Sequence, residues 1–414
     1  MSMQQELSMA LNLIRQFLVS AARWAWGSPE PLVIEFLPRT YDKDGVQPRT
    51  RSLKLILRSP RSEWHLKVAF HGTIEADQHP IFSKGLKRRN DLKDLCCCID
   101  FCKIQILDDT VTEVILSLDP STQSVRLPYK TQPHADSEYI SVIGHLWVRT
   151  LEDPLRIRFP VYNSNSGIPP RELSEIREKE ELDGHSVYKV LLYGDETLYV
   201  YKEVERPHYV PPDTEVLEQE LRNLELFRGN TVGIVQLVAA VVSPNPYQTS
   251  KEGDSNVLRG VLLEYYPNCT LENALKSPQT NGRWCQWALQ IASALAEMHQ
   301  RGLVHMDLKP ANVVISADFD AVLIDVSGIG GVTRQWLSPE MLGEKSPLSC
   351  SIEARKQNDL WALGRIMLTM ADTCCADHEE QLLRRIAQAA TRPPPRLPLS
   401  DAITALSERT SPVL

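Results

Sequence analysis

The chain has 414 residues, of which 43% are hydrophobic and 24% are charged. This composition is typical of a globular protein and excludes a collagen-like chain or one dominated by low-complexity disorder. At roughly 150 residues per domain, the length predicts two or three domains. The net charge of −8 argues against a general nucleic-acid-binding protein, because contacts with phosphates need a surplus of lysine and arginine on one face.

The first twenty residues predict an amphipathic helix. Leu7, Leu11, Ile14 and Leu18 recur at helical spacing, with charged residues off this stripe. The segment lacks the basic start and the uninterrupted apolar core of a secretory signal, so we expect it to pack on its own domain rather than to address the chain to mitochondria. No stretch approaches the ~18 consecutive apolar residues of a membrane span, and we expect no membrane partner.

The nine cysteines are an odd number in a chain too long to need disulfide bonds. They predict reduced thiols in a cytoplasmic protein, with the nucleus as the alternative compartment. Four of them cluster between positions 96 and 102. Their neighbours Leu95, Ile99 and Phe101 are apolar, and no second Cys/His pair lies at zinc spacing, so we expect a buried strand or helix rather than a metal site.

The first part of the chain, from about residue 32 to residue 161, alternates apolar and polar residues as half-buried strands do. The clearest predicted strands are Leu53–Leu57, Trp64–Phe70 and Leu155–Val161. The basic run Lys84–Arg89 is expected in a solvated loop between strands, with a nuclear-import patch as the alternative. We therefore predict a β-rich N-terminal module of unknown function, residues 1–165, and then a linker at Asn163–Arg171.

The second part of the chain changes from strands to helices. The predicted strands are Ser186–Leu192, Thr197–Val204, Gln236–Val242 and Val257–Glu264. The predicted helices are Glu215–Arg228, Trp284–Arg301, Asn358–Ala371 and Glu379–Ala390. A strand-rich piece followed by a helix-rich piece in about 250 residues predicts one α+β unit, residues 172–414, with two lobes and a cleft between them.

The most specific run of the sequence is LVHMDLKPANVV, at positions 303–314. Asp307 is a carboxylate on a predicted loop that can accept a proton, and Lys309 can neutralise charge on a transferred group. Asn312 and Asp325, the latter at the end of the apolar strand Ala321–Ile324, are hard oxygen ligands suited to Mg²⁺. Any one of these residues alone would be better interpreted as part of a solvated polar loop.

Together these residues resemble the catalytic loop H-R-D-L-K-x-x-N and the metal-binding motif D-F-G of eukaryotic protein kinases. The resemblance covers roughly residues 180–406 and continues in chain order at Val200–Lys202, Glu220, Leu263–Tyr266, Ser338–Glu340, Asp359–Gly364 and Arg396. It implies a two-lobed kinase fold that uses ATP and Mg²⁺. Lys309 followed by Pro310 is typical of serine/threonine kinases.

The resemblance also implies a role for each site residue. Lys202, held by Glu220, would position the α- and β-phosphates of ATP, and Asp307 would orient the hydroxyl of the acceptor. Lys309 would stabilise the moving phosphoryl group. The implied catalytic residues are Asp307, Lys309 and Asn312; the cofactor-binding residues are Val200, Lys202, Glu220, Glu264 and Tyr266; the metal ligands are Asn312 and Asp325. Glu340 and Arg396 are expected to form a mostly buried bidentate ion pair.

Several features depart from the kinase pattern. The three glycine positions of the phosphate-binding loop hold Glu180, Leu182 and His185, so the backbone N–H groups lose the close approach to the phosphates that glycine allows. The acidic residues Glu178, Glu180, Glu181 and Asp183 also put negative charge beside the phosphates, so ATP is expected to bind weakly. The D-F-G motif becomes Asp-Val-Ser, followed by Gly328. The segment from Asp325 to Glu340 has only 16 residues, which leaves little room for docking a peptide.

Met306 stands where kinases switched on by phosphorylation carry an arginine before the catalytic aspartate. An apolar side chain cannot bind a phosphate, so activity is not expected to depend on phosphorylation between Asp325 and Glu340. Thr333 is instead expected to hydrogen-bond towards Asp307 and Lys309.

Three functions remain open. An ATP-dependent serine/threonine kinase acting on a protein substrate is favoured, because every charged catalytic residue is present. A pseudokinase that binds partners without transferring phosphate is the alternative. A small-molecule kinase of the aminoglycoside phosphotransferase type ranks third, because it would not normally carry Lys309, Ser338–Glu340 or the motif at Asp359.

Overall fold

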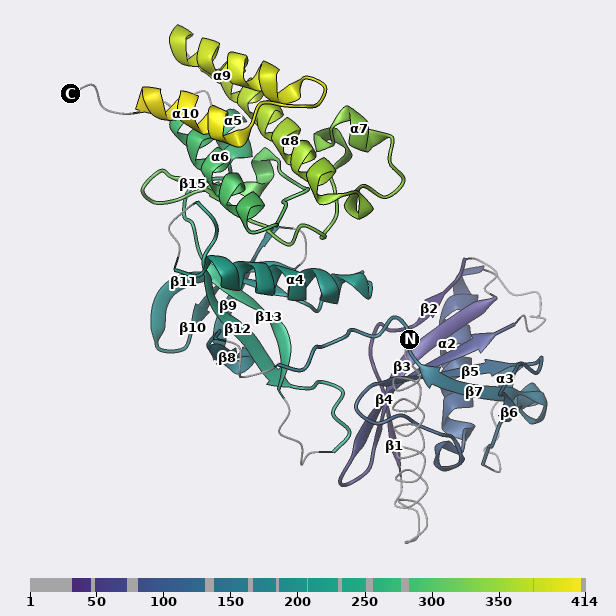
Figure 1. The fold of residues 1–414 in the computed structure, drawn as a ribbon. Coiled ribbons are helices and arrows are strands. Elements are labelled where there is room, and N and C mark those ends of the chain that lie inside the picture. Colours follow the sequence, from purple (N-terminus) through teal and green to yellow (C-terminus); the bar gives the residue numbers. More distant parts are fainter. Residues whose placement is uncertain are drawn as a thin grey trace, which may run out of the picture. The chain divides into compact units, whose positions relative to one another are not determined.

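The computed structural model describes residues 32–45, 49–72, 81–130, 138–162, 167–183, 186–206, 208–229, 233–250, 256–276, 283–374 and 376–410. The chain divides into two compact units (Figure 1). Unit 1 comprises residues 1–156 and 244–255, and unit 2 comprises residues 157–243 and 256–414. The amphipathic helix predicted for the first twenty residues lies outside the described part of the chain.

Unit 1 is built on a seven-stranded sheet in the order β1-β3-β4-β5-β7-β6, with β2 also paired to β3. The strands are β1 (Val33–Phe36), β2 (Asp42–Lys43), β3 (Thr50–Arg58), β4 (Glu63–His71), β5 (Val111–Ser117), β6 (Val125–Arg126) and β7 (Trp147–Glu152). Only β4 and β5 pair in parallel among these strands. Their connection contains helix α2 (Ile81–Cys98), because parallel neighbours need a crossover. A short helix, α3 (Glu138–Val142), precedes β7.

The core of unit 1 lies between its sheet and α2. Leu55 of β3 and Val68 of β4 pack with Leu92 and Leu95 of α2, and all four side chains are fully buried. The predicted strands at Leu53–Leu57 and Trp64–Phe70 are confirmed as parts of β3 and β4. The sequence pattern was sufficient here because apolar residues at every second position mark one buried face.

Two local predictions for this region are wrong. Leu155–Val161 forms no strand, and only Val161 makes an isolated bridge, to Val257. The Oδ1 atom of Asp153 accepts a hydrogen bond from the backbone N–H of Leu155, at 3.1 Å, and this local bond makes a turn instead of extended backbone. The basic run Lys84–Arg89 lies within α2 rather than in a loop. Lysine and arginine are good helix formers, so their charge did not decide the backbone conformation.

The cysteine cluster lies at the C-terminal end of α2. Cys96 and Cys98 are buried and Cys97 is exposed, which confirms the helical, largely apolar setting. Burial raises the pKa of the Cys96 thiol well above its usual value, because removal from water disfavours the thiolate. Cys96 is therefore a neutral packing residue at physiological pH.

Residues 244–250 follow a strand of unit 2 but belong to unit 1. Thr249 is buried, and its Oγ1 accepts a hydrogen bond from the backbone N–H of Asp109, at 2.8 Å. The backbone N–H of Thr249 donates to Oδ1 of Asp109 over the same distance, 2.8 Å, and its carbonyl accepts from Glu63, at 3.0 Å. The ring of Tyr247 also meets His65 edge to face, with 5.2 Å between centroids. Unit 1 is therefore completed by a segment far along the chain.

We expect Thr249→Val to destabilise unit 1. Valine keeps the shape of threonine but removes the Oγ1 atom that accepts from the backbone N–H of Asp109, and the loss of one such hydrogen bond costs about 0.5–1.5 kcal/mol. Chemical unfolding of the full chain measures this loss. The exposed Thr122, in the same unit, provides the control Thr122→Val. Equal unfolding midpoints for both variants would show that residues 244–250 do not stabilise unit 1.

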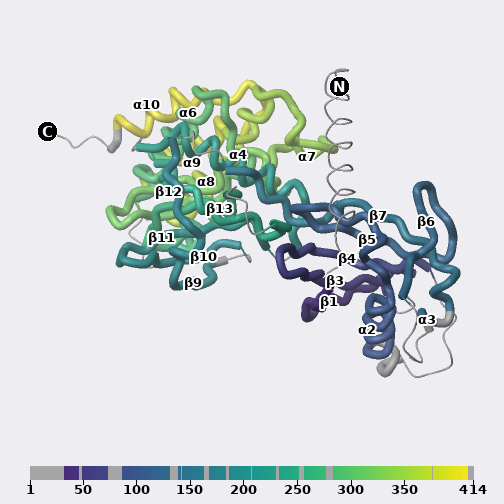
Figure 2. The backbone as a smooth tube through the Cα atoms, turned by 90° about the horizontal axis from the view of Figure 1, so that it is seen from below, coloured from purple at the N-terminus to yellow at the C-terminus, as the bar shows by residue number. Residues whose placement is uncertain are grey.

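Unit 2 begins with a strand-rich lobe. Its six-stranded sheet has the order β8-β12-β13-β11-β10-β9, and β9 and β10 lie next to each other at one edge (Figure 2). The strands are β8 (Pro170–Glu172), β9 (Ile176–Asp183), β10 (Val187–Leu192), β11 (Asp195–Glu203), β12 (Leu237–Pro244) and β13 (Asn256–Glu264). Helix α4 (Pro212–Phe227) lies between this sheet and the helices of unit 2 (Figure 1). The last two residues of the predicted linker Asn163–Arg171 belong to β8, and residues 163–166 lie outside the described part of the chain.

Within the described residues, the regular structure of the second lobe consists of helices and one short hairpin, β14 (Val313–Ile315) with β15 (Ala321–Leu323). Its helices are α5 (Leu271–Lys276), α6 (Trp284–Gln300), α7 (Pro339–Leu342), α8 (Ile352–Thr373), α9 (Asp377–Thr391) and α10 (Leu399–Thr410). The two-lobed α+β fold predicted from the sequence is confirmed. None of the described helices is long and apolar enough to cross a membrane.

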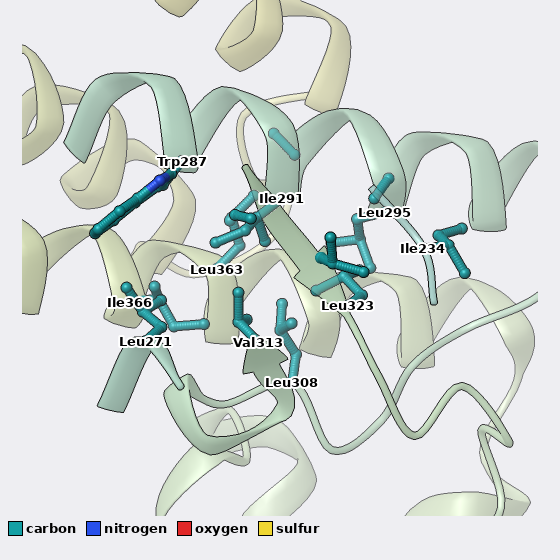
Figure 3. Packing of buried hydrophobic residues seen from close by; sticks show 14 of the residues in the cluster. Ile234, Leu271, Trp287, Ile291, Leu295, Leu308, Val313, Leu323, Leu363 and Ile366 are labelled. Atoms are coloured by element: carbon teal, nitrogen blue, oxygen red, sulfur yellow. The ribbon is translucent and has the colours of Figure 1, made fainter. Parts of the chain in front are cut away.

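The core of the helical lobe holds the hairpin in place. Ile291 and Leu295 of α6 and Leu363 of α8 surround Val313 of β14 and Leu323 of β15, and all five are essentially buried (Figure 3). The hairpin cannot shift without opening cavities among these side chains, at a cost of about 2–5 kcal/mol for each large side chain lost. The polar residues on either side of the hairpin therefore have a fixed backbone beneath them.

Candidate active site

Three charged side chains meet between the two lobes of unit 2. Nζ of Lys202, on β11, lies 2.6 Å from Oε2 of Glu220 on α4 and 2.7 Å from Oδ1 of Asp325, just past β15. Glu220 has no exposed surface, whereas the side chain of Asp325 is 46% exposed. One ammonium group thus connects the sheet, the helix α4 and the end of the hairpin.

The charges of this cluster shift one another's protonation. Burial disfavours the ammonium group of Lys202, but the carboxylates of Asp325 and Glu220 outweigh it and raise the Lys202 pKa. The same ammonium group lowers the pKa of Asp325 below its ordinary value. Burial raises the pKa of Glu220 against the attraction of Lys202. With both carboxylates ionised, the cluster carries one net negative charge, which favours a cation beside Asp325.

The loop that carries Asp307 forms the second cluster. Oδ1 of Asp307 accepts from the backbone N–H of Thr333, at 2.8 Å, and Oδ2 accepts from Nζ of Lys309, at 2.7 Å. Lys309 also donates to Oγ1 of Thr333, at 2.9 Å. The predicted hydrogen bonding of Thr333 towards Asp307 and Lys309 is confirmed. Nδ2 of Asn312 donates to the backbone carbonyl of Asp307, at 2.9 Å, so the amide group is oriented by the loop itself.

Helix α8 contacts this loop through Asp359, which has no exposed surface. Its two carboxylate oxygens accept from the backbone N–H groups of His305, at 2.9 Å, and Met306, at 2.8 Å. The His305 ring makes a further bond to the carbonyl of Ile324, at 3.0 Å. Met306 and Asp325 both adopt positive φ, 64° and 60°, which non-glycine residues rarely do outside sites where surrounding contacts impose it.

Asn312 and Asp325 could hold a metal ion together. The backbone N–H of Ile324 donates to the carbonyl of Asn312, at 3.1 Å, so the two candidate ligands lie on paired stretches of chain. Asn312 uses Nδ2 within the loop, and a ligand from this residue would be Oδ1. Only one carboxylate oxygen of Asp325 contacts Lys202, and the side chain is half-exposed. An amide oxygen and a carboxylate oxygen fit the preference of Mg²⁺ for hard oxygen ligands.

Of the remaining predicted cofactor residues, Val200 lies on β11, Glu264 ends β13 and Tyr266 follows that strand. Val200 pairs with Leu263 of the neighbouring strand β13, which ends at the next residue, Glu264. The backbone N–H of Glu264 already donates to the carbonyl of Gln236, at 3.1 Å, so this residue could offer adenine only its carbonyl. The phenol of Tyr266 donates to Oε2 of Glu264, at 3.1 Å. The assignment of all five residues to nucleotide binding stays a prediction.

The acidic side chains of β9 should repel the phosphates of ATP less than the sequence alone suggests, because some of them have cationic partners. Glu180 pairs across the sheet with Lys189 of β10, and their charged atoms are 2.6 Å apart. Lys179 likewise contacts Glu203 of β11, at 2.8 Å. Neither partner could be predicted from the sequence, because cross-strand neighbours depend on register. Residues 184–185 lie outside the described part of the chain, and weak ATP binding stays a prediction.

The ion pair predicted between Glu340 and Arg396 forms, but its predicted geometry is wrong. A single contact joins Nη2 of Arg396 to Oε2 of Glu340, at 2.7 Å, and the side chains are 1% and 45% exposed. Glu340 lies in the first turn of α7. Although partial burial opposes ionisation, Arg396, the backbone N–H of Glu340 itself and Ser338 together lower its pKa. The Glu340 carboxylate interacts both with Arg396 and with polar groups at the start of α7, and it makes a single contact with the arginine instead of a bidentate one.

The protein kinase domain family model matches residues 184–393, about half of the chain. The chain belongs to this family. It is 34% identical over 138 residues to cyclin-dependent kinase F-4 of Oryza sativa subsp. japonica, which covers 30% of this chain and 28% of that protein.

Two further relatives are kinases as well. Human 3-phosphoinositide-dependent protein kinase 1 is 35% identical over 97 residues, 20% of this chain and 16% of its own length. Mitogen-activated protein kinase kinase kinase 17 of Arabidopsis thaliana is 29% identical over 130 residues, 30% of this chain and 35% of its own length. The chain therefore spans only about a sixth to a third of the length of these relatives.

We expect Glu340→Gln to destabilise unit 2 by about 1–3 kcal/mol at neutral pH, because it removes the charge opposite a buried arginine. The folded-state pKa of Glu340 is lowered, so its stabilisation is complete above the ordinary carboxyl value and is lost as pH falls through the folded pKa. The difference in unfolding free energy between wild type and variant, measured from pH 7 to pH 3, should shrink below about pH 4.5. A constant difference across this range would contradict the assignment.

Proposed function

We propose that the protein is an ATP- and Mg²⁺-dependent serine/threonine protein kinase. The observation that carries this proposal is the simultaneous assembly of both charged clusters. Lys202, Glu220 and Asp325 are in contact, and Asp307, Lys309 and Thr333 form a closed hydrogen-bonded ring. Buried ion pairs contribute little more net stability than packed apolar side chains would, so stability alone does not account for two such clusters in one unit.

The roles follow from where each side chain lies. Lys202 would bind the α- and β-phosphates, and Lys309 would neutralise charge on the transferred group. Asp307 would orient the acceptor hydroxyl, because one of its oxygens is already fixed by the backbone of Thr333. Mg²⁺, when bound by Asn312 and Asp325, would supply charge neutralisation between the phosphates. The remaining work of the chain is positioning.

The acceptor class is proposed from the catalytic loop. Lys309 contacts both Asp307 and Thr333, which places a cation beside the aspartate as in serine/threonine kinases. Phosphoamino-acid analysis of a labelled generic acceptor should therefore show phosphoserine or phosphothreonine. Label on tyrosine would contradict the proposed acceptor class. The pseudokinase remains the second candidate, because no glycine-rich loop precedes β10.

The decisive test is Asp307→Asn in the full chain. The amide keeps an acceptor for Thr333 but loses the carboxylate that faces the hydroxyl, so transfer from labelled ATP to casein should fall about 100-fold or more. ATP with Mg²⁺ should still raise the unfolding temperature of the variant, and the apparent affinity derived from this rise should stay within a few-fold of the wild-type value. If wild-type protein shows neither transfer nor this rise, the pseudokinase function is correct.

A separate prediction concerns the segment from Asp325 to Glu340. Met306 is 1% exposed and Ser338 is equally buried, capping α7 through Oγ, while Oγ1 of Thr333 is bonded to Lys309. Phosphate on either hydroxyl would break these contacts. Treatment with a broad-specificity phosphatase should leave transfer activity unchanged, relative to heat-inactivated phosphatase. A loss of activity that maps to Thr333 or Ser338 would contradict this prediction.

A further inference from the structure

Asn223 of α4 has an unusual position for a polar side chain. It is 2% exposed, and its Nδ2 donates to the carbonyl of Val326, at 2.7 Å, and to the carbonyl of Ser327, at 3.2 Å. Its Oδ1 accepts from Nε2 of Gln219, at 2.8 Å. The amide therefore has partners on both sides. None of the roles assigned above uses this residue.

The contact joins the same two segments as the ion pair of Lys202. Glu220 and Asn223 are three residues apart on α4, so they share one face of the helix. Asp325, which Lys202 contacts, directly precedes Val326 and Ser327. Lys202 thus ties α4 to this segment at one point, and Asn223 ties them again nearly one turn further along. Two separate ties restrict rotation of the helix as well as its distance from the segment.

The segment after Asp325 is shaped to sit against α4. A Cβ atom at Gly330 would lie 3.1 Å from Cγ1 of Val216 on α4, and one at Gly328, whose φ is 69°, would lie 2.5 Å from the carbonyl of Val304. Oγ of Ser327 accepts from the backbone N–H of Gly330, at 3.0 Å. The chain therefore makes a close turn at the place where it departs from the D-F-G motif.

Breaking the contact would leave polar groups buried without partners. The carbonyl of Val326 belongs to a residue with no exposed surface, and water has little access to the amide of Asn223. An unpaired buried amide or carbonyl is strongly unfavourable, so the contact opposes any outward movement of α4.

We propose that Asn223 is a positioning residue that locks α4 to residues 326–327 and so keeps Glu220, Lys202 and Asp325 assembled without a phosphorylated segment. The catalytic consequence rests on the proposed kinase function, but the lock itself does not. The lock takes the place of an arginine-bound phosphate, for which Met306 provides no donor.

The lock is tested by amide hydrogen exchange on the full chain without nucleotide. Asn223→Leu, close in size but without a donor, should raise exchange about tenfold in residues 212–227 and 325–331 and leave α6 and α8 unchanged. Glu225→Leu, at an exposed position two residues further along α4, should behave as wild type. Unchanged exchange at 325–331, or an equal rise in all helices, would overturn the proposal.

Asn223→Asp provides a second variant if the leucine variant fails to fold. Its carboxylate keeps the shape but presents oxygen to two carbonyls, so exchange in residues 325–331 should rise as well. In the transfer assay, both variants should lower kcat about tenfold and leave the KM for casein unchanged, because the acceptor contacts are intact. An inactive wild type would refute the kinase function while the exchange result still judges the lock; wild-type exchange in Asn223→Asp would refute the lock alone.

Discussion

The arrangement of unit 2 depends on one partly buried lysine, whose ammonium group lies between two carboxylates. Placing Glu220 and Asp325 near each other without Lys202 would repel them, and burying Lys202 without either would cost several kcal/mol. The three side chains come from a strand, a helix and a hairpin end, so the lobes must be correctly packed before the cluster can form. The site is thus a consequence of the whole unit rather than of a local motif.

Hydrogen bonds from backbone N–H groups to buried or partly buried carboxylates hold the loop beside this cluster in place. Asp359 receives two N–H groups of the loop before Asp307, and Asp307 itself receives one from Thr333. Each bond satisfies a polar group that would otherwise be costly to bury. The loop is therefore preorganised, which is what phosphoryl transfer requires of a protein that mainly positions and stabilises charge.

The departures from the kinase pattern look less severe once the partners are known. Glu180 is balanced by Lys189, and the Val-Ser pair that replaces the usual Phe-Gly is held through its carbonyls by Asn223. A motif shows which residue has been replaced, but it does not show the partner of the new residue. Here the partners, Lys189 and Asn223, lie on other elements, outside the motifs that are altered.

The sequence by itself determined the two-lobed fold, most strands and helices of unit 2, and the identity of Asp307, Lys309, Asn312, Lys202 and Asp325 as site candidates. The fold and its elements follow from periodicity, and Asp307, Lys309, Asn312 and Asp325 follow from residue types in one short stretch, which are local properties of the chain. Lys202 is implied only by the resemblance to protein kinases. Only the tertiary structure decided that residues 244–250 complete unit 1, that Glu340 meets Arg396 through one bond, and that Asn223 joins α4 to residues 326–327. Such contacts depend on register and helix rotation across 56 to 140 residues of sequence, and no pattern of neighbouring residues encodes them.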